Sequence, residues 1–267
     1  MSRGIMGDTF VKYVRDFECP PEEAGSGDDS DPVAFARERL GFTPEAHQER
    51  VLRGARRAIL NCTRQFGKST VGAAMAVHLA YTKPESLVVA VSASGRQSGE
   101  LLLKAKKFVR KLGTEPKGDG HNEMSIAFPN GSRIVGLPDN EDTIRGFSAV
   151  SLLLIDEASR VSDETYRAVR PMLAVTNGDF WLMSTPKGRR GFFSDVWHEG
   201  GDWERILVTG PECKRIPADF LEKERTEGGE KYYRQEYLCE FLDADDAVFS
   251  KESLDRAMRG NFGPVGG

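Results

Sequence analysis

Short apolar runs alternate with amphipathic stretches along most of this chain, and this alternation predicts strands separated by helices. Runs such as Ser151–Ile155 and Phe180–Ser184 are almost entirely apolar, which is typical of strands buried on both faces. They predict an α/β fold, built as a doubly wound, mainly parallel sheet with helices on both faces. The runs that we interpret as strands are Ala58–Cys62, Leu87–Val91, Met124–Phe128, Ser132–Leu137, Ser151–Ile155, Phe180–Ser184 and Ile206–Val208.

Helices are expected between several of these strands, and one tight turn is marked clearly. Asn130 and Gly131 form a hairpin-turn signal, so the strands on either side of them should pair antiparallel. Helices are recognised by apolar spacing of three and four residues and by capping residues. The helices that we expect are Val33–Leu40, one capped by Thr43, one from Ser69 to about Tyr81, and Leu101–Leu112.

The overall composition is that of a globular protein, with 39% hydrophobic and 29% charged residues. No apolar run approaches the roughly 20 residues of a membrane-spanning helix, so we expect no membrane contact. A net charge of −4 gives no overall attraction to nucleic acid, which leaves local basic patches for any such contact. The four cysteines are far apart in sequence and are interpreted as reduced thiols.

The segment Thr63–Thr70 lies between an expected strand and an expected helix. In that context a loop can hold phosphate oxygens through backbone N–H groups and a helix N-terminus. Lys68 would contact the β- and γ-phosphates of ATP, and the Ser69 hydroxyl would bind Mg²⁺. Cys62 stands where the usual first glycine belongs, and a chance Gly-Lys-Ser at a helix start is the alternative. The residues expected to bind ATP here are Arg64, Gln65, Phe66, Gly67, Lys68, Ser69 and Thr70.

Two adjacent carboxylates, Asp156 and Glu157, follow the apolar run Ser151–Ile155. Ligands of parallel sheets bind at the carboxyl ends of the strands. Asp156 would hold Mg²⁺ there, and Glu157 would orient and deprotonate the attacking water, as phosphoryl transfer requires. An Asp-Glu pair that only caps a helix is the alternative. Together the two motifs predict Mg²⁺-dependent hydrolysis of ATP.

With these motifs in place, residues from about Gly41 to Phe249 resemble the ATPase domain of the large terminase subunit of tailed bacteriophages. The resemblance implies a P-loop ATPase of the additional-strand, catalytic-glutamate type that moves DNA during viral packaging. It rests on five segments in a fixed order: the phosphate loop Arg64–Ser69, the pair Arg145-Gly146, the acidic motif Leu153–Ala158, the coupling motif Ser184–Pro186, and the closing segment Tyr237–Phe241.

The resemblance also implies roles for three polar residues. Arg145 is the candidate arginine finger, which would complete the site of a neighbouring subunit. Arg64 is its rival and would act on the phosphates of its own subunit. Gln48 resembles the glutamine that reads the adenine edge, since its amide offers both a donor and an acceptor. A surface arginine at position 145 and a solvent-facing glutamine at position 48 are the alternatives.

A further set of residues is implied in coupling hydrolysis to DNA movement. The coupling residues would be Ser184, Thr185 and Pro186, although a simple strand end is the alternative. Two basic clusters are candidates for contact with the DNA backbone, which would be independent of sequence and sensitive to salt. One is Lys187, Arg189 and Arg190 in the following loop, and the other is Lys104, Lys106, Lys107, Arg110 and Lys111.

The implied organisation has three parts. Residues 1–40 form an N-terminal segment whose acidic loop between Cys19 and Pro32 has five acidic and no basic residues. Residues 41–249 form the P-loop ATPase domain, and residues 250–267 form a linker or the start of a missing nuclease domain. About 20 residues after Phe249 are too few for a nuclease, so we expect no DNA cleavage by this chain.

The implied partners are double-stranded DNA, the portal protein of the procapsid, the small terminase subunit and further copies of the chain in a ring. The implied location is the host cytoplasm, with transient docking on the viral procapsid. Two other functions stay open at this point. One is a superfamily 2 helicase-like ATPase module, because Asp156–Ser159 differs by one residue from a DEAD-type motif. The other is an assembly protein that binds nucleotide without hydrolysing it.

Overall fold

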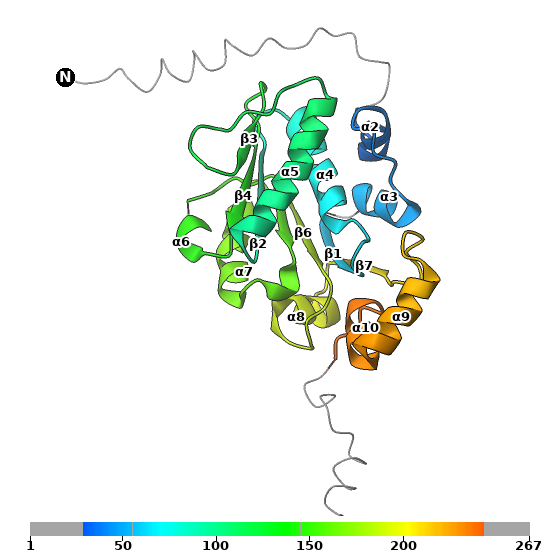
Figure 1. Cartoon of the computed structure of the whole chain (residues 1–267). Helices are drawn as coiled ribbons and strands as arrows, with labels where there is room; N and C mark the ends of the chain where they lie inside the picture. The colour runs from blue at the N-terminus through cyan, green and yellow to red at the C-terminus, as the bar shows by residue number, and fades with distance from the viewer. Residues whose placement is uncertain (1–28, 55, 145, 243–267) are drawn as a thin grey trace, which may run out of the picture.

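A seven-stranded sheet forms the centre of the computed structural model, which describes residues 29–54, 56–144 and 146–242 (Figure 1). The strand order is β3-β4-β2-β5-β6-β1-β7. Among these described strands only β3 and β4 pair antiparallel, across the turn at Asn130 and Gly131, and the other neighbouring strands are parallel. The expected α/β fold with a mainly parallel sheet is therefore confirmed. The strands are β1 Arg57–Cys62, β2 Leu87–Ser92, β3 Ser125–Ala127, β4 Arg133–Pro138, β5 Leu152–Asp156, β6 Asp179–Ser184 and β7 Glu204–Val208.

The central strands are apolar throughout because each supplies side chains to two cores, one on either face of the sheet. In β5, Leu152 and Leu154 belong to the first core, while Leu153 and Ile155 belong to the second. The side chains of β6 alternate in the same way, with Trp181 in the first core. Burying both faces explains why these strands lack the polar alternation of a half-exposed sheet.

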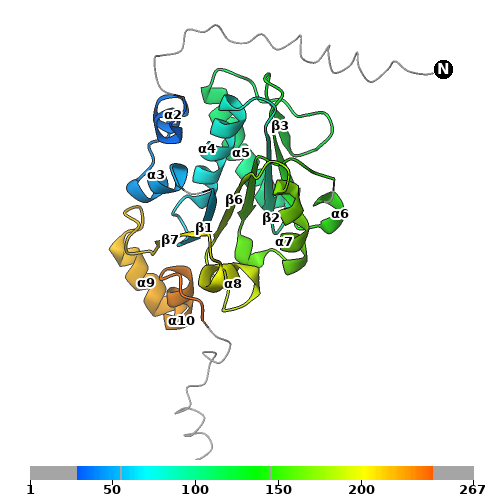
Figure 2. The same ribbon diagram turned by 180° about the vertical axis from the view of Figure 1, so that it is seen from behind.

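Helices cover both faces of the sheet (Figures 1 and 2). Helices α2 Pro32–Glu38, α3 Ala46–Leu52, α4 Lys68–Thr82 and α5 Gly95–Lys111 contribute to the first core. Helices α6 Glu141–Ile144, α7 Asp163–Val169 and α8 Gly191–Glu199 contribute to the second, with the short 3₁₀ segments Ala158–Arg160 and Arg170–Leu173. Two further helices, α9 Ala218–Gly228 and α10 Glu230–Glu236, share a third, smaller apolar cluster.

Helix α2 packs onto the C-terminal half of α4, although it precedes residue 41. The ring of Phe35 is buried 5.1 Å from the ring of His78 and 5.4 Å from that of Tyr81. The Nε2 atom of His78 lies 2.9 Å from the carbonyl oxygen of Asp29. The described residues before 41 thus contribute to the first core. Most of the expected acidic loop and the expected domain end at residue 249 lie outside the described residues.

Two expected helix starts are wrong. Helix α3 begins at Ala46 instead of next to Thr43, because Glu45 and Gln48 form a reciprocal capping box at its N-terminus. Helix α5 begins at Gly95 instead of Leu101, because the side chain of Ser94 accepts a hydrogen bond from the backbone N–H of Gln97. In the described ranges no helix is both long and apolar enough to cross a membrane.

Strand β6 lies between β1 and β5 in the sheet. Strand β1 leads into the Gly-Lys-Ser loop, and β5 ends in the acidic pair. The two strands that carry these motifs are therefore separated by one additional strand, which itself ends at Ser184.

Candidate active site

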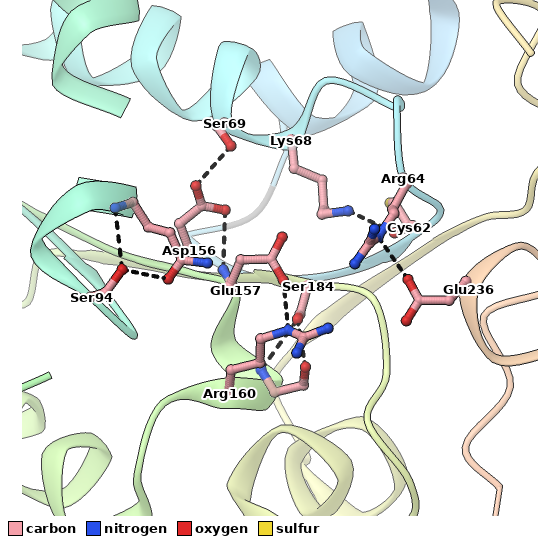
Figure 3. A network of polar contacts seen from close by, with 12 residues as sticks. Cys62, Arg64, Lys68, Ser69, Ser94, Asp156, Glu157, Arg160, Ser184 and Glu236 are labelled. Carbon is pink, nitrogen blue, oxygen red and sulfur yellow. Dashed lines mark hydrogen bonds and ion pairs between the residues drawn. The ribbon is translucent and has the colours of Figure 1, made fainter. Parts of the chain in front are cut away.

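The carboxyl ends of β1, β5 and β6 bring the expected motifs to one edge of the sheet (Figure 3). Lys68 and Ser69 begin helix α4 directly after the loop, while Asp156 ends β5 and Glu157 follows it. Ser184 ends β6, the strand that lies between β1 and β5. Parallel strands with their carboxyl ends aligned thus gather residues that are far apart in sequence, as in other ligand-binding α/β sheets.

Lys68 is 7% exposed, and its ammonium lies inside the loop. Its Nζ donates hydrogen bonds to the carbonyl oxygens of Cys62 and Thr63 at 2.8 and 3.1 Å. The positive charge of Lys68 is therefore held by neutral carbonyl oxygens of the loop. Phosphate oxygens form stronger, charge-assisted hydrogen bonds with an ammonium group, so the arrangement suits phosphate binding.

The loop requires glycine at position 67. Gly67 has a φ of 86°, in the left-handed region that side chains rarely adopt. A Cβ atom there would lie 3.2 Å from both the Nε2 of Gln48 and a terminal nitrogen of Arg215. Gln65 also has a positive φ, of 65°. The backbone thus approaches its neighbours closely at the start of α4, as a phosphate-binding loop must.

Asp156 is buried and accepts two hydrogen bonds. The hydroxyl of Ser69 donates to its Oδ2 at 2.7 Å, and the backbone N–H of Glu157 donates to its Oδ1 at 3.1 Å. Burial raises the pKa of this carboxyl, the hydrogen bond from Ser69 opposes the rise, and the charge of Glu157 adds to it. A cation beside the carboxylate would stabilise its charged form.

The oxygens of Ser69 and Asp156 are hard ligands of the kind Mg²⁺ prefers. Among the described residues no group of three or more His, Cys, Asp or Glu side chains could hold a metal ion. Mg²⁺ commonly uses one or two protein oxygens and completes its shell with water and substrate phosphates. The two side chains therefore fit Mg²⁺ bound together with a nucleotide.

Glu157 has a left-handed backbone conformation, with φ 54° and ψ 41°. Such a conformation is costly for a residue other than glycine and often occurs at functional sites. The side chain is partly exposed, and its Oε2 lies 3.5 Å from the Nε of Arg160. Its carboxylate therefore lies at the open edge of the sheet, where a water molecule can reach it.

Ser184 connects the end of β6 to the segment after the acidic pair. Its buried hydroxyl lies 2.8 Å from that of Ser159 and accepts from the backbone N–H of Ser159 at 3.2 Å. Thr185 and Pro186 are also buried. Of the three expected coupling residues, Ser184 thus contacts the segment that follows the acidic pair, and the sequence did not point to Ser159 as its contact.

Arg64 points toward helix α10 (Figure 3). Its Nε lies 2.8 Å from the Oε2 of Glu236, whose side chain is only 4% exposed, while that of Arg64 is 55% exposed. The hydroxyl of Thr63 donates to the carbonyl oxygen of Glu236 at 3.0 Å. Arg64 therefore ties the loop to α10. The rival candidate, Arg145, lies outside the described residues.

Gln48 lies against the phosphate loop from helix α3. Its Oε1 accepts from the backbone N–H of Glu45 at 2.9 Å, and its Nε2 donates to the carbonyl oxygen of Phe66 at 2.8 Å. The side chain is buried. An amide has two donors and two acceptor positions, so one of each stays available beyond these contacts.

Arg215, between β7 and α9, also contacts the phosphate loop, and no sequence pattern identified it. Its guanidinium donates to the carbonyl oxygen of Phe66, and its Nε lies 2.9 Å from the Oε1 of Glu45. A terminal nitrogen approaches Gly67. A guanidinium beside Gln48 and Gly67 adds a positive charge and a planar surface next to the loop.

The basic loop after the coupling residues is anchored to the C-terminal part of the described chain. The backbone N–H of Gly188 donates to the Oε1 of Gln235 at 3.2 Å, and that of Arg189 to the carbonyl oxygen of Leu242 at 3.0 Å. Lys187, Arg189 and Arg190 are exposed. The other basic cluster lies on α5, where Lys104 and Lys106 are partly buried and Lys107, Arg110 and Lys111 are exposed.

Comparison with known proteins agrees with this arrangement. A family model for the N-terminal part of the T4likevirus-type terminase large subunit matches residues 59–256. The chain is similar to the terminase large subunit of Escherichia phage T5, with 24% identity over 232 residues, which cover 82% of this chain and 52% of that relative. It thus spans about half the length of that relative.

Two solved structures have the same fold. The large terminase ATPase domain of Thermus phage P74-26 matches with a TM-score of 0.68 and 22% identity, over 77% of this chain and 96% of that domain. The large terminase of a thermophilic bacteriophage, solved in complex with ADP, matches with a TM-score of 0.60 and 16% identity, over 74% of this chain and 53% of that protein. These matches identify the α/β fold as that of terminase ATPase domains.

Proposed function

This chain belongs to the T4likevirus-type terminase large subunit family, in its N-terminal part, and on that premise we propose that it is the ATP-hydrolysing motor domain that moves double-stranded DNA into viral procapsids. One observation carries the proposal: the hydrogen bond of 2.7 Å between Ser69 and Asp156, which joins the phosphate loop to the acidic pair across the additional strand. This is the arrangement expected of the catalytic-glutamate type of P-loop ATPase.

Each side chain at this edge has a distinct role in the proposed reaction. Lys68 binds the β- and γ-phosphates of ATP, and Ser69 and Asp156 hold Mg²⁺. The ion, when bound, neutralises charge on the phosphates. Glu157 orients the attacking water and accepts its proton. The burial of Asp156 supports this division, because its carboxylate gains stability from a cation, while the more exposed Glu157 can reach water.

Three further residues complete the nucleotide site in this proposal, and a fourth supports the loop. Gln48 uses its remaining amide donor and acceptor on adenine, and Arg215 stacks its guanidinium near the base. Their shared contact with the carbonyl oxygen of Phe66 supports placing the base on that side of the loop. Arg145 is the finger supplied to a neighbouring subunit. Arg64 stabilises the link to α10, and its ion pair with Glu236 favours this role over direct contact with phosphate.

The coupling residues transmit the state of the nucleotide to the DNA-contacting loop. Ser184 lies next to Ser159, three residues after Asp156, and is followed by the basic residues of that loop. A change in the acidic segment therefore reaches the loop through Thr185 and Pro186. The residues proposed to contact the DNA backbone are Lys187, Arg189 and Arg190.

The partners of the whole protein follow from the family. We propose that they are double-stranded DNA, the portal protein, the small terminase subunit and further copies of this chain in a ring. The place of action is the host cytoplasm, at the procapsid. We propose that the ATPase domain extends to about residue 249 and includes helix α2 as well as the expected residues from 41 onward, because α2 packs into the first core. Residues 250–267 are proposed as a linker or the start of a nuclease domain.

Two substitutions test the assignment of the site. Lys68→Ala should weaken ATP binding and abolish turnover, because it removes the cation that holds the phosphates. Glu157→Gln should retain ATP binding while hydrolysis falls by about 10²–10⁴-fold, because the amide cannot accept the proton of the water. Binding is measured with a fluorescent ATP analogue, and hydrolysis by release of inorganic phosphate.

Glu164→Gln is the matched control, since Glu164 is an exposed carboxylate on nearby α7. It should leave both binding and hydrolysis unchanged. Normal turnover of the Glu157→Gln variant would exclude Glu157 as the base. Turnover by the Lys68→Ala variant at the rate of the unsubstituted protein would exclude the proposed ATP site altogether.

A further inference from the structure

A polar cavity lies at the opposite edge of the sheet from the nucleotide site. It has a volume of about 550 Å³ and is lined by residues at the amino ends of β1, β6 and β7 and by the end of α7. Arg57 begins β1, Gly178 precedes β6, and Trp203 precedes β7. Strands of five or six residues place this cavity about 15–20 Å from the phosphate loop. It is therefore separate from the proposed ATP site.

Three arginines line this cavity: Arg57, Arg167 and Arg170. No acidic residue lines it. Within the described ranges the ion pairs found involve other arginines and lysines, and none of these three guanidinium groups. Two acidic residues that follow Gly178 and Trp203 of the lining along the chain already have partners. Asp179 pairs with Arg56 at 3.2 Å, and Glu204 pairs with Arg50 at 2.9 Å. The cavity therefore keeps an excess of positive charge.

Aromatic side chains form a fixed wall beside these arginines. The ring of Tyr166 is stacked on that of Phe192 at 4.2 Å, and Phe180 lies 5.2 Å from Trp203. The guanidinium of Arg170 lies 5.6 Å from the centre of the Tyr166 ring. Burial raises the pKa of the Tyr166 phenol, while Arg170 and Arg57 act to lower it, so its hydroxyl is close to both charges. It is a neutral donor beside these two cationic ones.

We propose that this cavity is a phosphate-binding site. Guanidinium groups bind phosphate through two parallel hydrogen bonds, and three of them match a group that carries up to two negative charges. A single carboxylate would use fewer of these donors, which favours phosphate over an acidic peptide. The volume lies within the range of about 300–1,000 Å³ for small-molecule sites.

Two sources could supply the phosphate: the backbone of duplex DNA and a free nucleotide or phosphate ion. Naming DNA rests on the proposed function, whereas phosphate binding itself does not. A site here would hold DNA, or sense nucleotide, without using Lys68. Both sources make the same contact with the arginines, so they must be separated by experiment.

The test uses the whole chain with Arg57→Ala, Arg167→Ala and Arg170→Ala combined, in a Lys68→Ala background that removes the ATP site. Inorganic phosphate, ADP and a short blunt-ended DNA duplex are titrated separately. We expect phosphate binding to weaken by at least about tenfold. If DNA is the source, duplex binding should weaken similarly, and the dependence of log K on log salt should become shallower by about 0.9 for each DNA phosphate that is no longer neutralised.

Arg50→Ala is the matched control, because it removes one positive charge at the same edge but outside the cavity. Arg167→Lys with Arg170→Lys keeps the charge but removes the paired donors, so its affinity should be intermediate. Weaker phosphate and ADP binding with unchanged duplex binding would support the site and assign it to free nucleotide.

Unchanged binding of all three probes in the triple variant would overturn the proposal. The proposal would also be overturned if Arg50→Ala weakened phosphate binding as much as the triple substitution does. Binding of polyglutamate but not of phosphate by the Lys68→Ala chain would overturn it as well. ATP hydrolysis without DNA, measured with Lys68 restored, should be unaffected by the triple substitution. Absence of ATP hydrolysis in the chain with its natural arginines and Lys68 would count against the motor assignment, whereas unchanged phosphate binding in the triple variant would count against this site, so the two failures are distinguishable.

Discussion

Asp156 is a buried carboxyl, and burial disfavours its negatively charged form. Burial raises its pKa above the usual value of 3.8. A carboxyl whose pKa is higher in the folded than in the unfolded chain stabilises the fold most when protonated. That contribution is present below the usual pKa and is lost as the pH rises through the folded pKa. At neutral pH the charge of Asp156 therefore costs stability, which a bound cation would restore.

Asp156→Asn should raise the melting temperature of the nucleotide-free protein at neutral pH and abolish Mg²⁺-dependent hydrolysis. The amide keeps one oxygen for the N–H of Glu157 and can still form a hydrogen bond with Ser69. The gain should shrink on acidification toward about pH 4, where the natural side chain is itself protonated. Thermal unfolding followed by circular dichroism at several pH values measures this. A loss of stability of equal size at every pH would contradict the explanation.

The candidate site residues that lie within a short local motif could be predicted from the sequence. Lys68, Ser69, Asp156 and Glu157 each follow a strand, and the topology alone brings them together. Arg215 and Glu236 were not predicted, because their contacts with the loop arise only when the segments after β7 fold onto it. No local pattern marks such a residue.

Strands were predicted better than helix starts, and the reason is physical. A strand buried on both faces is a continuous apolar run, whereas a helix start depends on one or two capping contacts. Glu45 and Gln48 form a capping box without the serine or threonine that usually marks one, so the sequence pattern points to Thr43 as the cap instead. Helices α6 to α10 were not predicted. Length alone does not explain this, because α2 and α3 have seven residues each, like α7 and α10, and were expected from the proline and capping signals near their starts.

Helix α2 offers a test of whether the first helix stabilises the whole fold. Phe35→Ala should lower the free energy of unfolding by about 3–5 kcal/mol, because it removes a fully buried ring from the contact with α4. Phe220→Ala is the control, since Phe220 is 42% exposed and should cost much less. Urea denaturation measures both. Equal and small losses would mean that α2 is not part of the cooperative unit.

At the scale of the whole molecule, the question is whether one chain contains a complete active site. Arg64 pairs with Glu236 of its own α10. A finger from a neighbour, Arg145, would make activity depend on assembly. The two possibilities differ in how turnover responds to protein concentration.

We expect hydrolysis per subunit to rise with protein concentration, and Arg145→Ala to lower the plateau by about 10³-fold or more. Arg225→Ala serves as the control, because Arg225 is exposed and its contacts, with Glu230 and the ring of Tyr233, are local to α9 and α10. Phosphate release across a wide concentration range measures both. Turnover that is independent of concentration, with loss of activity in Arg64→Ala instead, would assign the finger to the same chain.

The position of β6 also fixes the distance between the phosphate loop and the acidic pair. Neighbouring strands are about 4.8 Å apart, so β1 and β5 are held about 10 Å from each other. Trp181 and Leu182 anchor β6 in opposite cores, and neither face can shift without repacking the other. Packing on both faces of the sheet therefore fixes the separation between the phosphate loop and the acidic pair. In the proposed motor, movement arises beyond the ends of these strands, as in the loop that carries Lys187, Arg189 and Arg190, while the sheet itself keeps its shape.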